Sequence, residues 1–178
     1  QKDGDGWGNG SQPKLIKGPD LFVDTMTELK KTHNIFVVLS GPSRGYVKSR
    51  LDAGGVPYLH RYVDSASGMI DLYQVLDLYL VTSREEGGPM GLTEAIASGV
   101  EVISTDVGQA RDIMGEIAPD SLVENFNYRD IAAAVERQMD KHLNLRTQIT
   151  RKLRQEVVSK YDWRVIAKSH LEKVYLDN

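Results

Sequence analysis

A glycine-rich stretch at residues 80–99 is the part of the chain whose residue types and spacing are best suited to chemistry. It links an apolar strand pattern to a helical pattern, and Gly87, Gly88 and Gly91 lie between the two. Glycine lets the backbone approach a ligand closely, and the free amides at a helix start carry a partial positive charge. The stretch therefore predicts a binding site for a phosphate group.

Glu94 adds a second binding function, because it lies one helical turn beyond the glycines. An ionised carboxylate only accepts hydrogen bonds, so it can bind both hydroxyls of a ribose. A phosphate site beside a ribose site indicates a nucleotide. A second interpretation stays open on spacing alone: the glycines form a common strand-to-helix turn, and Glu94 only stabilises the helix dipole.

Apolar runs and helical patterns alternate along the chain and must position this stretch. Strands are expected at 35–39, 58–63, 78–82, 100–104 and 121–123, with helices between them and three helices at the end, the first lined by residues 131–143. This alternation predicts a doubly wound, Rossmann-like parallel sheet with helices on both faces, in the α/β class. Ligands bind beyond the carboxyl ends of such strands, in loops that here begin at Gly41, Asp64, Ser83 and Thr105.

The composition of the 178 residues indicates one globular domain. The chain has no cysteine, which excludes disulfides and thiolate sites, and its formal net charge of −3 disfavours broad binding of nucleic acid. The sequence contains no apolar run long enough to cross a bilayer and no signal pattern at its start. We therefore expect a single cytoplasmic domain over 1–178, with 1–13 forming a flexible glycine-rich loop.

The two glutamates carry a resemblance to a known family. Seven residues separate Glu86 from Glu94, and this spacing, within the segment 80–108, resembles the Glu-x7-Glu signature of family 4 glycosyltransferases. Three further segments, 17–22, 36–42 and 161–167, resemble the family's first phosphate-binding helix, its next strand and turn, and its C-terminal helix. The resemblance covers residues 14–175 and implies the C-terminal, donor-binding half of a glycosyltransferase B fold, without the N-terminal acceptor-binding half.

The family resemblance implies metal-independent transfer of a hexosyl group, with retention, from a nucleotide-diphosphate sugar and without a further cofactor. Glu86 matches the catalytic glutamate beside the donor sugar, and Glu94 matches the glutamate that binds the ribose hydroxyls. Met90 and Gly91 match positions whose amides hold the diphosphate. Lys17 matches the lysine that neutralises the diphosphate as the leaving group gains negative charge.

Further substrate-binding positions follow from the same resemblance. They lie in or next to the glycine-rich loop or at the ends of strands: Gly41, Tyr62, Val63, Gly87, Gly88, Pro89 and Leu92. The loop after the strand that ends at Tyr62 and Val63 matches the region that contacts the base. Two positions depart from the family pattern. Pro89 has no amide to offer a sugar hydroxyl, and Gln12 stands where the family has a basic residue, for which Lys2 is the candidate replacement.

The expected central strand of the family's fold has no counterpart in the sequence. This strand normally precedes the loop assigned to residues 1–13. Its loss would leave ladder groups of both neighbouring strands unpaired. We therefore expect either residues upstream of the sequence or another segment to fill the place, and a continuous sheet built only from the five expected strands would contradict the assignment.

Metal binding is the weaker interpretation of the other polar motifs. Asp3 and Asp5 resemble the start of a calcium loop, but the twelfth position from Asp3 is Lys14 and not the glutamate that such a loop needs. The four histidines show no ligand spacing, and His60 lies in a strand pattern typical of a core or edge residue: His33, His60, His142 and His170.

A basic stretch in the C-terminal helices has two interpretations. Such a stretch is usually a solvated helix face, and weak association with a membrane surface is the alternative: Arg146, Arg151, Lys152 and Arg154.

The sequence also leaves functions other than sugar transfer open. A sugar-nucleotide epimerase of the same fold and a non-catalytic nucleotide-binding module both remain compatible with the sequence.

Overall fold

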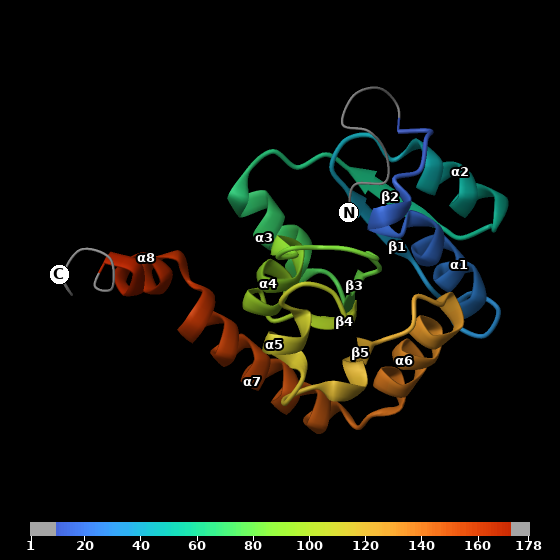
Figure 1. The fold of residues 1–178 in the computed structure, drawn as a ribbon. Coiled ribbons are helices and arrows are strands. Elements are labelled where there is room, and N and C mark those ends of the chain that lie inside the picture. The colour runs from blue at the N-terminus through green and yellow to red at the C-terminus, as the bar shows by residue number, and fades with distance from the viewer. Residues whose placement is uncertain (1–9, 172–178) are drawn as a thin grey trace.

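Parallel strands form two separate sheets in the computed structural model, which describes residues 10–171 (Figure 1). The first sheet pairs β1 (Val37–Ser40) with β2 (Tyr58–Arg61). The second sheet has the order β3 (Leu78–Val81), β4 (Glu101–Thr105) and β5 (Leu122–Val123). The expected α/β class with parallel strands is confirmed, and the strand expected at 58–63 ends two residues early, at Arg61.

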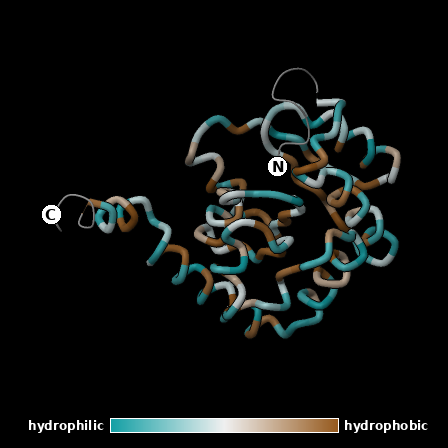
Figure 2. The backbone as a smooth tube through the Cα atoms, viewed as in Figure 1, coloured by the Kyte–Doolittle hydropathy of each residue, from teal (hydrophilic) through white to brown (hydrophobic). Residues whose placement is uncertain are grey.

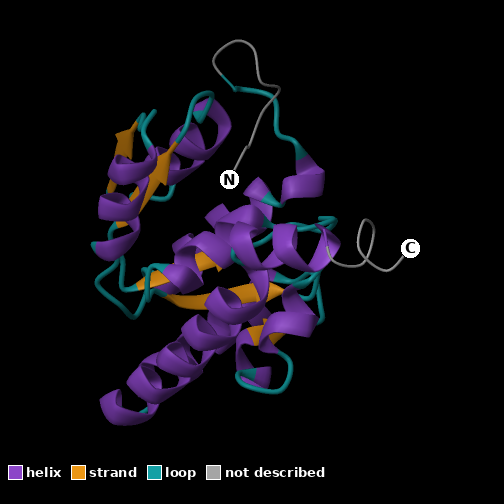
Figure 3. Ribbon diagram, turned by 90° about the vertical axis from the view of Figure 1, so that its left-hand side faces the viewer, coloured by secondary structure: helices purple, strands orange, loops and turns teal. Residues whose placement is uncertain are grey.

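The interruption between the two sheets agrees with the lack of a central strand in the sequence. Within residues 10–171 no strand hydrogen-bonds to both β1 and β3, and the two groups of strands stand apart in Figure 3. The five expected strands therefore do not form one continuous sheet. The result that would have contradicted the family assignment is not observed.

The described residues form eight α-helices. They are α1 (Pro19–Leu29), α2 (Gly45–Ala53), α3 (Ala66–Gln74), α4 (Met90–Ala97), α5 (Ala110–Met114), α6 (Tyr128–Asp140), α7 (Leu143–Tyr161) and α8 (Trp163–Leu171). Two short 3-10 helices, η1 (Leu15–Lys17) and η2 (Pro119–Ser121), complete the order. Helix α7 packs against α4 and α5, and α8 extends away from the sheets beyond it (Figure 1).

The first of the C-terminal helices is shorter than the apolar spacing predicts. The pattern at 131–143 suggested one helix through Leu143, but α6 ends at Asp140 and Lys141 is extended. His142 then begins α7, because its Nδ1 accepts a hydrogen bond from the Asn144 amide at 3.3 Å. Leu143 is consequently exposed at the start of α7.

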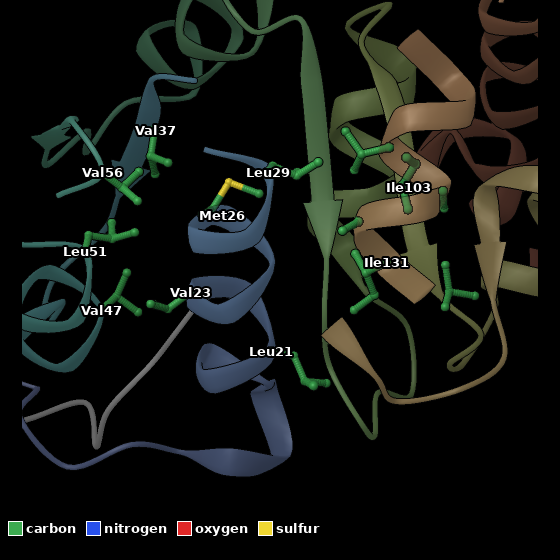
Figure 4. Close-up of a cluster of buried hydrophobic side chains, with 14 of the residues drawn as sticks. Leu21, Val23, Met26, Leu29, Val37, Val47, Leu51, Val56, Ile103 and Ile131 are labelled. Atoms are coloured by element: carbon green, nitrogen blue, oxygen red, sulfur yellow. The ribbon is translucent and has the colours of Figure 1, made fainter. Parts of the chain in front are cut away.

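Helix α1 connects the two sheets through its apolar side chains. Proline at its first position and an aspartate in its first turn favour the helix start at Pro19. Val23 and Met26 point toward the β1–α2 side, whereas Leu21 and Leu29 lie on the side of α1 that faces the three-stranded sheet and α6 (Figure 4). Burial of each such side chain contributes about 1.5–3 kcal/mol. One hydrophobic core therefore spans both sheets.

A second core lies between the three-stranded sheet and helices α4, α5 and α7. Its fully buried members include Leu92, Ile96, Ile113 and Met114, and α7 adds Leu153 and Val157. Figure 2 shows apolar residues gathered along the central strands and hydrophilic residues on many outer helix surfaces. The second core holds α4, and with it the end of the glycine-rich stretch, firmly against β3 and β4.

Candidate functional site

A pocket of about 250 Å³ lies at the carboxyl end of β3, beside the first residues of α4. Five of the residues predicted as a site line it: Glu86, Pro89, Met90, Gly91 and Leu92. A larger pocket of about 420 Å³ lies between β5, α5 and α6, but no predicted site residue lines it. The smaller pocket has the position expected for a ligand of a parallel sheet, so it is the candidate site.

The start of α4 offers backbone amides to the pocket. Helix α4 begins at Met90, and none of the described side chains caps it. Pro89 has no amide, and the Leu92 amide donates to the Pro89 carbonyl at 2.9 Å. The amides of Met90 and Gly91 are therefore the donors at this helix start that an anion could use, whereas the Leu92 side chain is fully buried in the core.

Glu86 lies within hydrogen-bond distance of two side chains at the mouth of the pocket. Lys17 Nζ is 2.6 Å from Glu86 Oε1, and the Ser83 hydroxyl donates to the same oxygen at 2.9 Å. The side chains of Lys17 and Glu86 are 26% and 19% exposed, so solvent partly screens the ion pair. The pair contributes little to stability, but it fixes a positive charge beside the carboxylate predicted to be catalytic.

Gly18 and Thr82 bring Lys17 close to the strand end. Gly18 has a φ of +62°, which ends η1 and begins α1, and its carbonyl accepts a hydrogen bond from Thr82 Oγ1 at 2.9 Å. A Cβ at position 18 would lie 1.8 Å from the Thr82 carbonyl oxygen. Only glycine permits so close an approach of η1 to β3.

Arg84 ties the same two segments together from the other side. Its guanidinium donates to the Leu15 carbonyl at 2.6 Å and to both carboxylate oxygens of Asp20, and its amide donates to the Ile16 carbonyl at 2.8 Å. Burial raises the pKa of the Asp20 carboxyl, but the hydrogen bonds and charge of Arg84 lower it more, and the net pKa lies below the usual value. The sequence analysis did not identify Arg84 as part of the site.

Glu94 lies one turn along α4, outside the residues that line the pocket, and its carboxylate is exposed. The buried Tyr73 hydroxyl, at the end of α3, donates to Glu94 Oε2 at 2.9 Å. Burial, followed by the neighbouring Tyr79 and Glu94, raises the pKa of the Tyr73 phenol far above its usual value, so it remains a donor. Sequence reasoning found Tyr73 only as an apolar position of a helix.

Tyr79 closes the floor of the pocket from β3. Its ring meets that of Tyr73 edge to face, with centroids 5.5 Å apart. A Cβ at Gly91 would lie 2.3 Å from the Tyr79 hydroxyl oxygen. Glycine at position 91 is therefore required by the tyrosine beneath it as well as by any ligand above it.

The backbone of the glycine-rich loop is supported by Gly108, which the sequence analysis did not identify as part of the site. Gly108 has a φ of +53°, and a Cβ there would lie 2.6 Å from the Glu86 carbonyl oxygen. Gln109 approaches Gly88, with 3.5 Å between its Nε2 and a Cβ placed on that glycine. Around Gly87 no described atom lies within 4 Å of such a Cβ, so this glycine faces open space.

The remaining predicted positions lie away from the pocket lining. Tyr62 and Val63 follow β2 in the first sheet, and Tyr62 is 68% exposed. Gly41 follows β1 with a φ of +86°, and its carbonyl contacts His60 Nε2 at 2.7 Å, in edge strand β2. Lys2 lies outside the described residues.

The described residues contain neither a candidate metal site nor a candidate membrane span. Among residues 10–171 no three His, Asp or Glu side chains are grouped as they would be around a metal ion, and the Asp3–Asp5 motif lies outside this range. In the same range, no helix combines the length and apolar character needed to cross a bilayer.

Comparison with protein families identifies the chain. Residues 13–156 match the model of the family described as "Glycosyl transferases group 1". The chain belongs to this family. The glycosyltransferase resemblance carried by Glu86 and Glu94 is thereby confirmed.

Individual glycosyltransferases agree with the family match. The chain is 31% identical over 106 residues to a lipopolysaccharide core biosynthesis mannosyltransferase, LpsB, of Rhizobium meliloti, covering 55% of this chain and 30% of the relative. It is 25% identical over 160 residues to an N,N'-diacetylbacillosaminyl-diphospho-undecaprenol alpha-1,3-N-acetylgalactosaminyltransferase of Campylobacter jejuni, covering 88% and 40%. The chain thus spans less than half the length of either relative.

A solved glycosyltransferase domain shows the same fold. The C-terminal domain of a glycosyl transferase group 1 family protein from Francisella tularensis superposes with a TM-score of 0.70 at 20% identity, covering 84% of this chain and 82% of that one. The expected architecture, the C-terminal half of a glycosyltransferase B fold with additional C-terminal helices, is confirmed.

The contact between Gly91 and Tyr79 yields a stability prediction. Gly91→Ala places a methyl group against the Tyr79 hydroxyl, and we expect the free energy of unfolding to fall by about 1–3 kcal/mol, as for other overpacked sites. In a Tyr79→Phe background, the hydroxyl is absent and the same substitution should cost less. Urea unfolding of the four proteins measures the difference, and an equal cost in both backgrounds would contradict the contact.

Proposed function

We propose that this chain binds a nucleotide-diphosphate sugar and supplies the donor side of a hexosyl transfer that retains the anomeric configuration. The observation that carries the proposal is a pocket lined by Glu86 and the first residues of α4, with Lys17 ion-paired to Glu86 beside it. A positive side chain and free amides favour a diphosphate, and the adjacent carboxylate suits a sugar. The proposal requires no cofactor besides the donor substrate.

Lys17 and the start of α4 would act on the leaving group. When the bond between sugar and diphosphate breaks, negative charge accumulates on the diphosphate. In this proposal the amides of Met90 and Gly91, at the start of α4, and the ammonium of Lys17, beside Glu86, would face that charge. They stabilise the transition state more than the ground state, which is what increases the rate.

Glu86 would act at the sugar. Its carboxylate is held by Lys17 and Ser83 at the mouth of the pocket, and Gly108 supports its backbone from behind. A carboxylate fixed in this way stabilises positive charge on the reacting sugar carbon beside the diphosphate. Exposed Gly87 and Gly88, next along the loop, leave room for the sugar on the solvent side.

The acceptor would be bound by a second half that is not part of this chain. Both relatives named above are sugar transferases, and the chain spans 30% and 40% of their lengths. Their names include lipopolysaccharide core biosynthesis and an undecaprenol diphosphate. We therefore propose a glycan, lipid-linked or small-molecule acceptor, with the isolated chain inactive or nearly so in transfer.

Lys17 provides the first test of donor binding. Lys17→Ala should weaken binding of UDP or GDP by about 1.5–3 kcal/mol and leave uridine or guanosine nearly unchanged, because only the diphosphates carry the charge that Lys17 neutralises. Lys14→Ala, on an exposed lysine three residues earlier, is the matched control. Calorimetry and NMR titration measure both series. Equal losses for nucleosides and diphosphates would contradict the phosphate role, and no binding of either diphosphate to the wild type would favour a module that retains only the fold.

Product analysis separates transfer from epimerisation. Radiolabelled nucleotide sugar incubated with the protein, its acceptor-binding half and a lipid-linked acceptor should yield labelled acceptor in the retained configuration. Free epimerised sugar in place of labelled acceptor would support the alternative epimerase.

Glu86→Gln is expected to reduce transfer by at least about 100-fold at nearly unchanged UDP or GDP affinity, because glutamine keeps the shape of the side chain and removes its negative charge.

A weak attachment to the cytoplasmic membrane surface is proposed for the α7–α8 arm. Residues 143–171 hold seven Lys or Arg and two Asp or Glu, whereas the whole chain holds 22 and 25. Arg151 and Lys152 are exposed on α7, and Trp163, at the start of α8, is 74% exposed. Basic side chains together with an exposed tryptophan favour an anionic lipid surface.

Vesicle sedimentation tests this attachment. The protein should sediment with phosphatidylglycerol vesicles and not with phosphatidylcholine vesicles, and the double variant Arg151→Glu, Lys152→Glu should lose roughly 10-fold or more in affinity, since each basic residue near the surface contributes about 1 kcal/mol. Lys30→Glu with Lys31→Glu, after α1, controls for net charge. Equal loss in both double variants would assign the effect to overall charge.

A further inference from the structure

The carboxylate of Glu94 is exposed, but a buried group holds it. Tyr73, 4% exposed, comes from the end of α3 and donates from its hydroxyl to Glu94 Oε2 at 2.9 Å. An exposed glutamate normally samples several rotamers, and fixing one of them costs side-chain entropy. Here the cost is met during folding, before any ligand binds.

Tyr73 is itself fixed from two sides. Its ring packs in the second core, beside Leu92 and Ile96 of α4, and Tyr79 meets it edge to face at 5.5 Å and 68°. The Tyr79 hydroxyl in turn lies directly under Gly91. The phenol therefore has a fixed direction relative to α4, and so does the carboxylate that it holds.

The Tyr73 phenol keeps its proton near neutral pH. Burial raises the pKa of Tyr73, and the neighbouring Tyr79 and the carboxylate of Glu94 raise it further. A neutral phenol donates one hydrogen bond, and an ionised carboxylate has several acceptor sites on two oxygens. One oxygen of Glu94 is oriented by Tyr73, and the other lone pairs stay available to a ligand with paired hydroxyls.

We propose that Tyr73 is a positioning residue that orients Glu94 to bind the ribose hydroxyls of the nucleotide. This inference rests on the proposed donor binding. It differs from a purely structural role, in which Glu94 serves only to satisfy the hydroxyl of a buried tyrosine. The two roles predict different dependence on the ribose hydroxyls.

The test compares a ribonucleotide with its dideoxy form. UDP and GDP, with 2′,3′-dideoxy-UDP and 2′,3′-dideoxy-GDP, are titrated calorimetrically into wild type and Tyr73→Phe, and the base that wild type binds more tightly is used. Tyr73→Phe should weaken the ribonucleotide about 3- to 10-fold, the value of one hydrogen bond, and leave the dideoxy form unchanged. Tyr46→Phe, which removes a hydroxyl that accepts a hydrogen bond from Arg50 on α2, is the matched control.

A double-mutant cycle with Glu94→Ala, which removes the acceptor of the Tyr73 hydroxyl, guards against general destabilisation. If Tyr73 acts through Glu94, then Tyr73→Phe has no further effect on ribonucleotide binding in the Glu94→Ala background. Urea unfolding of each variant reports any loss of stability separately.

The outcomes distinguish this inference from the proposed function. Wild type that prefers the ribonucleotide, with equal losses of both ligands in Tyr73→Phe or with no loss, overturns the positioning role and leaves donor binding intact. Wild type that binds both forms equally removes the ribose role of Glu94 and overturns the positioning role, but leaves donor binding intact. Wild type that binds neither diphosphate overturns both proposals. A selective loss of ribonucleotide binding that disappears in the Glu94→Ala background supports the positioning role.

Discussion

The close approach of η1 to the end of β3 is the constraint on which the site depends. The carbonyl groups of Leu15, Ile16 and Gly18 all accept hydrogen bonds from residues at the end of β3. Because Gly18 has no side chain, the two backbones meet at a separation that any Cβ would prevent. This contact joins the α1 side of the molecule to the three-stranded sheet and sets Lys17 against Glu86. Without it, the lysine and the carboxylate would belong to separate surfaces.

The order of elements and the position of the site were predictable from local pattern. Five apolar runs gave strands close to their observed bounds, because buried parallel strands read as continuous apolar segments. The glycines before Glu94 indicated a helix start with free amides, and α4 begins at Met90 as that requires. The helix boundary at residues 141–142 was missed, since apolar spacing continues across it and only the extended Lys141 and the cap by His142 end one helix and begin the next.

The residues that hold the site in place were not predictable, because their partners are distant in sequence. Arg84 reads as one charge in a polar loop, and only the fold brings Asp20 to it. Tyr73 and Tyr79 read as apolar positions of a helix and a strand, yet their hydroxyls face Glu94 and Gly91. In the sequence Gly108 is typical of a turn, and only the fold shows that the Glu86 carbonyl lies against it. In each case the role depends on a contact between residues distant in the sequence, which the spacing of residues does not reveal.

The ion pair at the pocket mouth has a consequence for how an anion would enter. Since Lys17 already has a carboxylate at 2.6 Å, an incoming phosphate does not meet a bare cation but shares it with Glu86, or displaces Glu86 from it. Binding of the phosphate would then exchange one negative partner of Lys17, the Glu86 carboxylate, for another. Small inorganic anions, which offer a single contact, gain little from such an exchange, whereas a ligand that also occupies the amides of α4 recovers the lost attraction. In the proposed function, the ion pair of Lys17 and Glu86 would therefore favour ligands that make several contacts over simple salts.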